Sequence, residues 1–310
     1  MENAPFFDDI ADGPAGTAHW ITTADGLHIR VAHWTGPDVK GTVLLFPGRT
    51  EYIEKYGTAA AELLARGYAS IVIDWRGQGL ADRTSNVAAM GDVAEFSDYQ
   101  HDVTAAVAHA RALNLPEPFY LLAHSMGGCI GLRALHNGLP VAAAAFSAPM
   151  WGVILSPVLR PFAWIASTIA TKIGKGTIMS PGQTTQSYVL RETFEANTLT
   201  NDPDVFATLK SQLTAHPELG LGGPSLRWLN GSLREMRRLS KMPSPDVPCC
   251  TFLGTSEAIV DPERIHIRMD NWSNGTLHMI EGGKHEVMME APKVRTHVFD
   301  TLTAHFDQHR

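Results

Sequence analysis

One ten-residue segment, residues 119–128, constrains the fold of this chain more than any other. It reads Phe-Tyr-Leu-Leu-Ala-His-Ser-Met-Gly-Gly: an apolar run typical of a buried strand ends at Ser125, and an apolar helical pattern follows. Small residues, Ala123 and Gly127, stand two positions before and after this serine. They are needed because the serine backbone in such a turn is strained and larger neighbours would collide. The segment therefore predicts a nucleophile elbow, in which alanine replaces the usual first glycine.

Strand and helix signals alternate along most of the chain. The helices are expected over residues 51–66 and 97–115 and from residue 292 onward. The strands are expected as two arms of a hairpin within 18–34 and then at 42–46, 70–74, 118–123, 142–147, 249–253 and 277–281. Strands that alternate with helices predict an α/β fold: a mostly parallel, eight-stranded sheet flanked by helices.

The middle of the chain breaks this alternation. From residue 150 to about 242 there are helical segments and loops without a convincing strand, and a proline-rich linker follows at 242–248. A helical insertion after the sixth strand predicts a cap over the strand ends, where such sheets bind ligands. We therefore expect a core of residues 1–149 and 246–310 and a cap of residues 150–245.

Composition and charge exclude several classes of protein. The chain has 310 residues, 44% of them hydrophobic and 18% charged, which is typical of a globular protein. Its net charge of −7 argues against a nucleic-acid partner. The acidic N-terminus does not resemble a secretory signal, and the longest apolar stretch, 150–170, is interrupted by prolines and an arginine. Three cysteines (Cys129, Cys249 and Cys250) provide no disulfide framework. We expect a soluble, cytoplasmic protein.

A serine hydroxyl becomes a good nucleophile only when a base takes its proton and a carboxylate orients that base. Among 14 histidines, His285 is distinguished by following the last predicted strand through Gly-Gly-Lys, a turn that can place it at the sheet edge. The turn after the preceding strand offers two carboxylates, Glu257 and Asp261. Glu257 lies nearer the strand end and is the predicted acid. Asp261 precedes a proline, which also suits the N-cap of a helix, and it is the alternative acid.

The oxyanion of acyl transfer needs two backbone N–H donors. One is expected from Met126, directly after the nucleophile. The other is expected from Arg49, because Gly48 lets this loop approach closely after the 42–46 strand. The loop 74–79 is expected to brace the site, since it lacks the third glycine and the helix start of a dinucleotide fingerprint. The spacing of histidine, cysteine and carboxylate residues predicts no metal site.

Five segments together resemble the bacterial lysophospholipase branch of the monoacylglycerol lipase-like α/β-hydrolases: residues 47–56, 74–79, 124–128, 221–229 and 284–286. The resemblance extends over nearly the whole chain. It implies the α/β-hydrolase fold, with Ser125 as nucleophile, His285 as base, Glu257 as acid, and Arg49 and Met126 as the oxyanion hole. This sequence departs from the pattern at Pro47, where monoacylglycerol lipases commonly have histidine, and at Ala123.

The resemblance implies a serine carboxylic-ester hydrolase that forms an acyl-enzyme and acts on a single-chain lipid, a lysophospholipid or monoacylglycerol, without a cofactor. A short-chain carboxylesterase of broad range is one alternative. An aminopeptidase-like hydrolase is another, and it needs a cap carboxylate such as Glu192, Glu195 or Glu235 to hold an amine. A ligand-binding protein on the same fold is the non-enzyme alternative, against which the complete set of catalytic residues argues.

Apolar residues at the start of the cap are candidates for an acyl tunnel; burial against the core is the other interpretation. The predicted substrate-binding residues are Met150, Trp151, Ile154 and Phe162. Further along, the cations at 234, 237, 238 and 241 recur at helical spacing and form a basic face. Such a face is usually only solvated, but it is also suited to a lipid phosphate or an anionic membrane. Transient contact with the inner membrane face is therefore expected, while the oligomeric state stays open.

Overall fold

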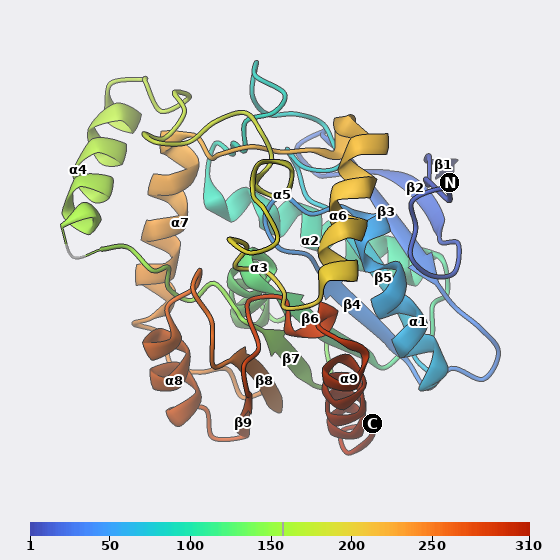
Figure 1. Cartoon of the computed structure of the whole chain (residues 1–310). Coiled ribbons are helices and arrows are strands. Elements are labelled where there is room, and N and C mark those ends of the chain that lie inside the picture. Colours follow the sequence, from blue (N-terminus) through green and yellow to red (C-terminus); the bar gives the residue numbers. More distant parts are fainter. Residues whose placement is uncertain (157) are drawn as a thin grey trace.

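The computed structural model describes residues 1–156 and 158–310. Within them, nine strands form one sheet in the order β1-β2-β3-β5-β4-β6-β7-β8-β9 (Figure 1). The strands are β1 (Glu2–Asn3), β2 (Thr17–Thr22), β3 (His28–Trp34), β4 (Thr42–Phe46), β5 (Ala69–Asp74), β6 (Phe119–His124), β7 (Ala144–Ser147), β8 (Cys249–Gly254) and β9 (Gly275–Ile280). The prediction of a mostly parallel sheet is confirmed, and all eight predicted strands are present. The ninth, β1, is a two-residue strand that pairs antiparallel with β2 and is too short to give a sequence signal.

Buried residues on both faces of the central strands explain why these strands are apolar throughout. β4 pairs in parallel with β5 and β6, and each of its five residues is buried. Val43 and Leu45 belong to the core on one side of the sheet, whereas Leu44 and Phe46 belong to the core on the other. Side chains on a strand alternate between faces, so a strand covered on both sides needs a continuous apolar run.

Helices cover both faces, as predicted. Helices α1 and α9 contribute to one core, and α2, α3 and α8 to the other. The predicted helix 51–66 is divided into a short 3₁₀ helix, η1 (Ile53–Tyr56), and α1. The α-helices are α1 (Gly57–Ala65), α2 (Tyr99–Ala112), α3 (Ser125–His136), α4 (Leu159–Lys172), α5 (Tyr188–Arg191), α6 (Pro203–Ala215), α7 (Leu226–Leu239), α8 (Pro262–Asp270) and α9 (Pro292–Asp307). Besides η1, the 3₁₀ helices are η2 (Phe96–Asp98), η3 (Pro217–Leu219) and η4 (Val287–Met289).

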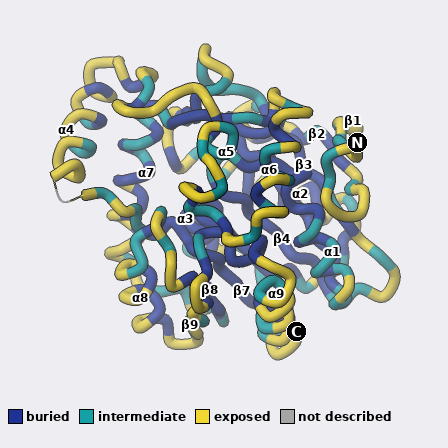
Figure 2. Tube along the Cα trace, viewed as in Figure 1, coloured by how far each residue is buried: buried dark blue, intermediate teal, exposed yellow. Residues whose placement is uncertain are grey.

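Helices α4 to α7 lie between β7, the sixth of the eight predicted strands, and β8. Figure 1 shows α4 beside α7 at the outer edge of the molecule, and Figure 2 shows that much of α4 is exposed. The cap also contacts the core near residue 285: the backbone N–H groups of His285 and Glu286 donate to the carbonyls of Thr198 (3.4 Å) and Leu199 (2.8 Å). Of the helices in the described residues, none combines the length and apolarity needed to cross a bilayer.

Candidate active site

Ser125 is the first residue of α3 and directly follows β6. Its φ angle of 49° lies in the left-handed region, which a non-glycine residue adopts only under strain. A side chain at Gly127 would have its Cβ 2.1 Å from the Phe46 carbonyl oxygen and 2.5 Å from that of Pro47. The glycine is therefore required because the first turn of α3 packs directly against the end of β4. The alanine at 123, buried in β6, is compatible with the same turn.

His285 lies between the serine and a carboxylate. Its Nε2 is 2.9 Å from Ser125 Oγ, and its Nδ1 is 2.8 Å from Glu257 Oε2. Both hydrogen bonds form when Nδ1 carries the proton, because Nε2 then accepts from the serine hydroxyl. The histidine reaches this position through a turn after β9 that includes Gly282, whose φ is 67°. It is only 4% exposed, so bulk water does not compete strongly for these bonds.

Glu257, rather than Asp261, is the carboxylate that meets His285. Its other oxygen accepts the backbone N–H groups of Ile259 (2.6 Å) and Val260 (3.0 Å). Burial raises the pKa of Glu257, but the bond and charge of His285 and these two N–H groups outweigh it and hold the pKa below its usual value. Asp261 stands at the N-cap position of α8, makes no side-chain capping bond, and lies 3.5 Å from an Arg160 nitrogen.

The side chains of Glu51 and Gln78 hold the loop after β4 by accepting the backbone N–H groups on either side of Arg49. The N–H of Gly48 donates to the Glu51 carboxylate, and that of Thr50 donates to Gln78 Oε1 at 2.6 Å. Gln78 Nε2 in turn donates to the Gly48 carbonyl at 3.5 Å, and Thr50 has a φ of 68°. In the part of the chain that the structure describes, the Arg49 N–H has no hydrogen-bond acceptor. The loop thus leaves one backbone donor available.

The second donor is available for a different reason. Met126 lies in the first turn of α3, where N–H groups have no partner within the helix. The tight packing of Gly127 on the end of β4 brings this turn next to the Arg49 loop. The side chain of Arg49 points to the cap, where it donates to the Gly222 carbonyl and lies 5.3 Å from the centre of the Trp228 ring. Burial lowers its pKa to about 10. Arg49 therefore anchors its loop to the cap through the side chain.

The four predicted substrate-binding residues lie in two different environments. Met150 and Trp151 are buried, and the Met150 N–H donates to the Ser125 carbonyl at 2.8 Å. Trp151 packs on Phe146 and also lines a cavity of about 280 Å³. Ile154 and Phe162 are largely exposed on the outside of the cap. The structure thus brings one of the four, Trp151, to a cavity of the cap.

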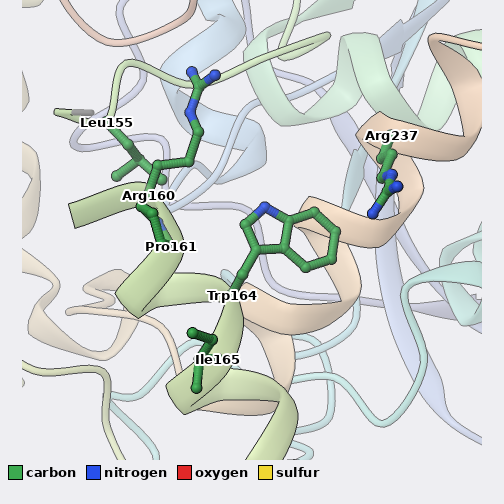
Figure 3. A pocket seen from close by; sticks show the side chains of 6 residues that line it. All are labelled: Leu155, Arg160, Pro161, Trp164, Ile165 and Arg237. Atoms are coloured by element: carbon green, nitrogen blue, oxygen red, sulfur yellow. The ribbon is translucent and has the colours of Figure 1, made fainter. Parts of the chain in front are cut away.

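A larger cavity of about 660 Å³ lies between α4 and α7, adjoining the one that Trp151 lines (Figure 3). It is lined by Leu155, Arg160, Pro161, Trp164, Ile165 and Arg237. The two cavities share Leu155, Arg160, Trp164 and Arg237, so they adjoin each other, and apolar side chains and arginines line the place where they meet. Such a space has room for an amphiphile.

Several residues around the site escaped the sequence analysis. Gln78 was expected only as part of a bracing loop, and His124 was named only within the segment 124–128. The structure places His124 fully buried, with its ring centre 4.8 Å from that of His285. Glu51 and Lys55 are four positions apart, a spacing that predicts an ion pair on a helix, but sequence alone gives no sign that Glu286 joins them.

Comparisons with known proteins found relatives that are similar to most of this chain. A probable lysophospholipase L2 of Haemophilus influenzae is 27% identical over 98% of this chain and 94% of its own length. Lysophospholipase L2 of Escherichia coli is 26% identical over 93% of this chain and 87% of its own length. Both relatives therefore match nearly end to end.

Among solved structures, a soluble variant of monoglyceride lipase from Saccharomyces cerevisiae superimposes with a TM-score of 0.75 at 20% identity, covering 99% of both chains. A carboxyl esterase from Bacillus coagulans gives a TM-score of 0.75 at 14% identity over 95% of this chain and 98% of its own. At this identity the structures establish a shared α/β-hydrolase fold. The model of the serine aminopeptidase S33 family matches residues 37–292, most of the chain, and this chain therefore belongs to that hydrolase family.

Proposed function

We propose that this chain is a serine carboxylic-ester hydrolase in which Ser125 is the nucleophile, His285 the base and Glu257 the acid. The observation that carries the proposal is the continuous hydrogen-bonded chain from Ser125 Oγ through the imidazole to Glu257, at 2.9 Å and 2.8 Å. The available N–H groups of Arg49 and Met126 support it further, because they suit an oxyanion formed at the serine.

The reaction follows from these positions. Ser125 Oγ attacks the ester carbonyl while His285 Nε2 takes the hydroxyl proton. The carbonyl oxygen becomes negative and accepts the N–H groups of Arg49 and Met126. His285 then returns its proton to the leaving alcohol, and the acyl-enzyme remains. Water, activated by the same histidine, releases the carboxylic acid and restores Ser125.

The proposed substrate is a single-chain lipid, a lysophospholipid or a monoacylglycerol. The names of the lysophospholipase and monoglyceride lipase relatives support this class. The apolar space between α4 and α7 supports it as well, because its lining of Leu155, Trp164 and Ile165 suits an acyl chain. We propose that residues 150–245 act as a cap that receives the acyl chain.

An aminopeptidase activity, which the family description raises, needs a carboxylate that is free to bind an amine. Of the three candidates, Glu235 is buried against Arg133, and Glu192 pairs with Arg191 at 2.9 Å. Glu195 is exposed on the cap surface. Two of the three candidates are therefore already paired with an arginine, and Glu195 is the one that an amine could still reach.

The exposed face of α4 supports a transient contact with a lipid surface. Large apolar side chains lie 53–70% exposed at positions 158, 159, 162, 165, 169 and 173. At 100° per residue these six positions fall within an arc of about 120°, so they form one stripe, named here the α4 face. Exposed cations adjoin it at Lys172 and Lys175, although the chain as a whole carries a charge of −7. A stripe of this kind beside cations suits the interface of an anionic membrane.

The proposed location is the cytoplasm, at times peripheral to the inner face of the membrane. The cysteines support a reducing compartment, since Cys129, Cys249 and Cys250 are all unpaired and buried. Burial raises the pKa of the Cys249 thiol to about 12 and raises the pKa values of Cys129 and Cys250 well above the usual value. The three thiols therefore stay protonated and unreactive.

The assignment is tested by labelling the chain with a fluorophosphonate and assaying lysophospholipids, monoacylglycerols and short nitrophenyl esters. Ser125→Ala should abolish labelling and lower kcat by a factor of about 10⁴–10⁶ while the protein stays folded. A variant that kept more than about a tenth of the activity would exclude Ser125 as nucleophile. Amino-acid nitroanilides are assayed beside these esters, and a preference for these amides would support the aminopeptidase alternative.

A further inference from the structure

Four ionisable side chains are buried together beside the proposed triad: Glu51, Lys55, His124 and Glu286, each at most 9% exposed. The Lys55 ammonium lies 2.6 Å from a carboxylate oxygen of Glu51 and 2.6 Å from one of Glu286. His124 Nε2 lies 3.4 Å from the other oxygen of Glu286 and 3.7 Å from Glu51. We call this group the buried ion cluster.

The cluster joins three segments that each carry part of the proposed site: the loop after β4, the end of β6 and the turn after β9. Residues 47–50, which follow β4 and include Arg49, are called here the oxyanion loop. Glu51 follows this loop, and its carboxylate accepts the N–H of Gly48 and the hydroxyl of Tyr56. His124 immediately precedes the nucleophile and is fixed by its Nδ1, 3.0 Å from the Ser147 carbonyl oxygen on β7. Glu286 immediately follows His285. A displacement of any one of these three segments would therefore break its contacts with the other two.

The charges within the cluster favour an imidazolium at position 124. Burial lowers the pKa of His124, but Glu286 and Glu51 outweigh it and raise the pKa above its ordinary value. Burial raises the pKa of Glu286, yet Lys55 and His124 hold it well below its usual range. Two carboxylates are then balanced by two cations. Glu51, His124 and Glu286 also offer donor atoms within 4.8 Å of one another, as a metal site would, but the Lys55 ammonium already provides a cation there.

We propose that the buried ion cluster positions the oxyanion loop and His285 relative to each other, with Glu51 holding the loop and a charged His124 placed next to His285. The groups facing His285 are Glu257, Glu286, Ser125 and His124. Those facing His124 are Glu51, Glu286, Lys55 and His285. These residues touch no reacting atom and are positioning residues. The proposal rests on the proposed hydrolase function.

The first test replaces Glu51 by Gln. One oxygen of the Glu51 carboxylate accepts from Lys55, and the other accepts from Gly48 and Tyr56. An amide has a single acceptor oxygen, so the variant cannot accept both from Lys55 and from Gly48. We expect kcat for a short nitrophenyl ester to fall by about 10²-fold, as when an oxyanion donor is removed, with KM changed by less than about threefold. The matched control is Glu235→Gln, which breaks another buried ion pair, with Arg133, and should leave kcat within about threefold of wild type.

A loss in Glu51→Gln no larger than in the control, after correction for the folded fraction, would overturn the positioning role. The second test does not depend on Glu51. His124→Gln removes a positive charge next to His285. The midpoint of the kcat/KM–pH profile should therefore rise by about one unit in this variant and stay at the wild-type value in Glu235→Gln. Loss of packing alone would not raise the midpoint.

A midpoint in His124→Gln that stays at the wild-type value, or that falls, would overturn the charged role of His124. The tests are separable from the hydrolase assignment, because that assignment is judged on wild type and Ser125→Ala. If wild type neither reacts with a fluorophosphonate nor hydrolyses esters, the function is wrong. If wild type is active and the cluster variants behave like Glu235→Gln, only the cluster proposal is wrong.

Discussion

The α4 face gives a prediction whose size follows from exposure. The perturbation is a triple substitution, Leu159→Ser, Ile169→Ser and Ile173→Ser, at side chains that are 59%, 53% and 66% exposed. None of the three lines the described cavities. Because these side chains already face water, their replacement should leave the free energy of unfolding nearly unchanged.

Full burial of a leucine or isoleucine side chain contributes about 1.5–3 kcal/mol. Just over half of each side chain is available here, so each contributes about 1–1.5 kcal/mol when α4 enters the membrane interface. The three together contribute about 3–4 kcal/mol. Since about 1.4 kcal/mol corresponds to a factor of ten, the partition coefficient should fall by about 100- to 1000-fold.

The assay is co-sedimentation with vesicles that contain phosphatidylglycerol, over a range of lipid concentrations. Ile267→Ser is the matched control, because Ile267 is 49% exposed but lies on α8, away from the α4 face. Hydrolysis of a short nitrophenyl ester, which needs no membrane, reports that the triple variant remains folded and active. Equal partitioning of wild type and triple variant, or an equal loss in the Ile267→Ser control, would refute membrane contact through α4.

Two further predictions concern the carboxylates and the pH dependence. Glu257→Gln should lower kcat by about 10³–10⁴-fold, because His285 loses the partner that fixes its tautomer. Asp261→Asn should lower kcat far less. If steady-state kinetics gave the reverse order, Asp261 would be the acid. Because the pKa of His124 is raised in the folded state above its ordinary 6.5, its stabilising contribution is complete below that value and is lost as the pH rises through the folded pKa. Denaturant titrations across this range should show the decline in wild type but not in His124→Gln, and parallel curves for the two proteins would contradict it.

The fold could be predicted from sequence because buried parallel strands leave a clear pattern. Strands such as β4, β6 and β8 are apolar throughout and end in turns with glycine or small residues. The order of Ser125, Glu257 and His285 along the chain then limited the site to three strand ends. The two-residue strand β1 could not be predicted, because it has neither length nor alternation.

The acid and the cap show where sequence reasoning ends. Glu257 and Asp261 follow the same strand, and only the path of the turn, with Glu257 bound to the N–H groups of Ile259 and Val260, directs one of them to His285. In the cap, hydrophobicity alone could not tell Trp151, which is buried, from Phe162, which is exposed. That distinction depends on which segments cover each side chain: Trp151 packs beside Trp272, which is distant in the sequence, whereas Phe162 lies on the exposed face of α4.

The energetics of the buried ion cluster favour a role in positioning catalytic groups over a role in stabilising the fold. Moving charges such as Lys55 and Glu286 out of water costs several kcal/mol per ion, and well-packed apolar side chains often stabilise a core as well or better. Stability alone is therefore a weak reason for two carboxylates, an ammonium and a histidine at this place. An ion network does, however, have directional bonds that an apolar cluster lacks, and here those bonds end on the Gly48 N–H and on Glu286, the residue after His285, while His124 lies 3.4 Å from the other oxygen of Glu286. Because a shift of about 1 Å at reacting groups can cost about 100-fold in rate, such directional bonds favour catalysis even where they add little to the free energy of unfolding.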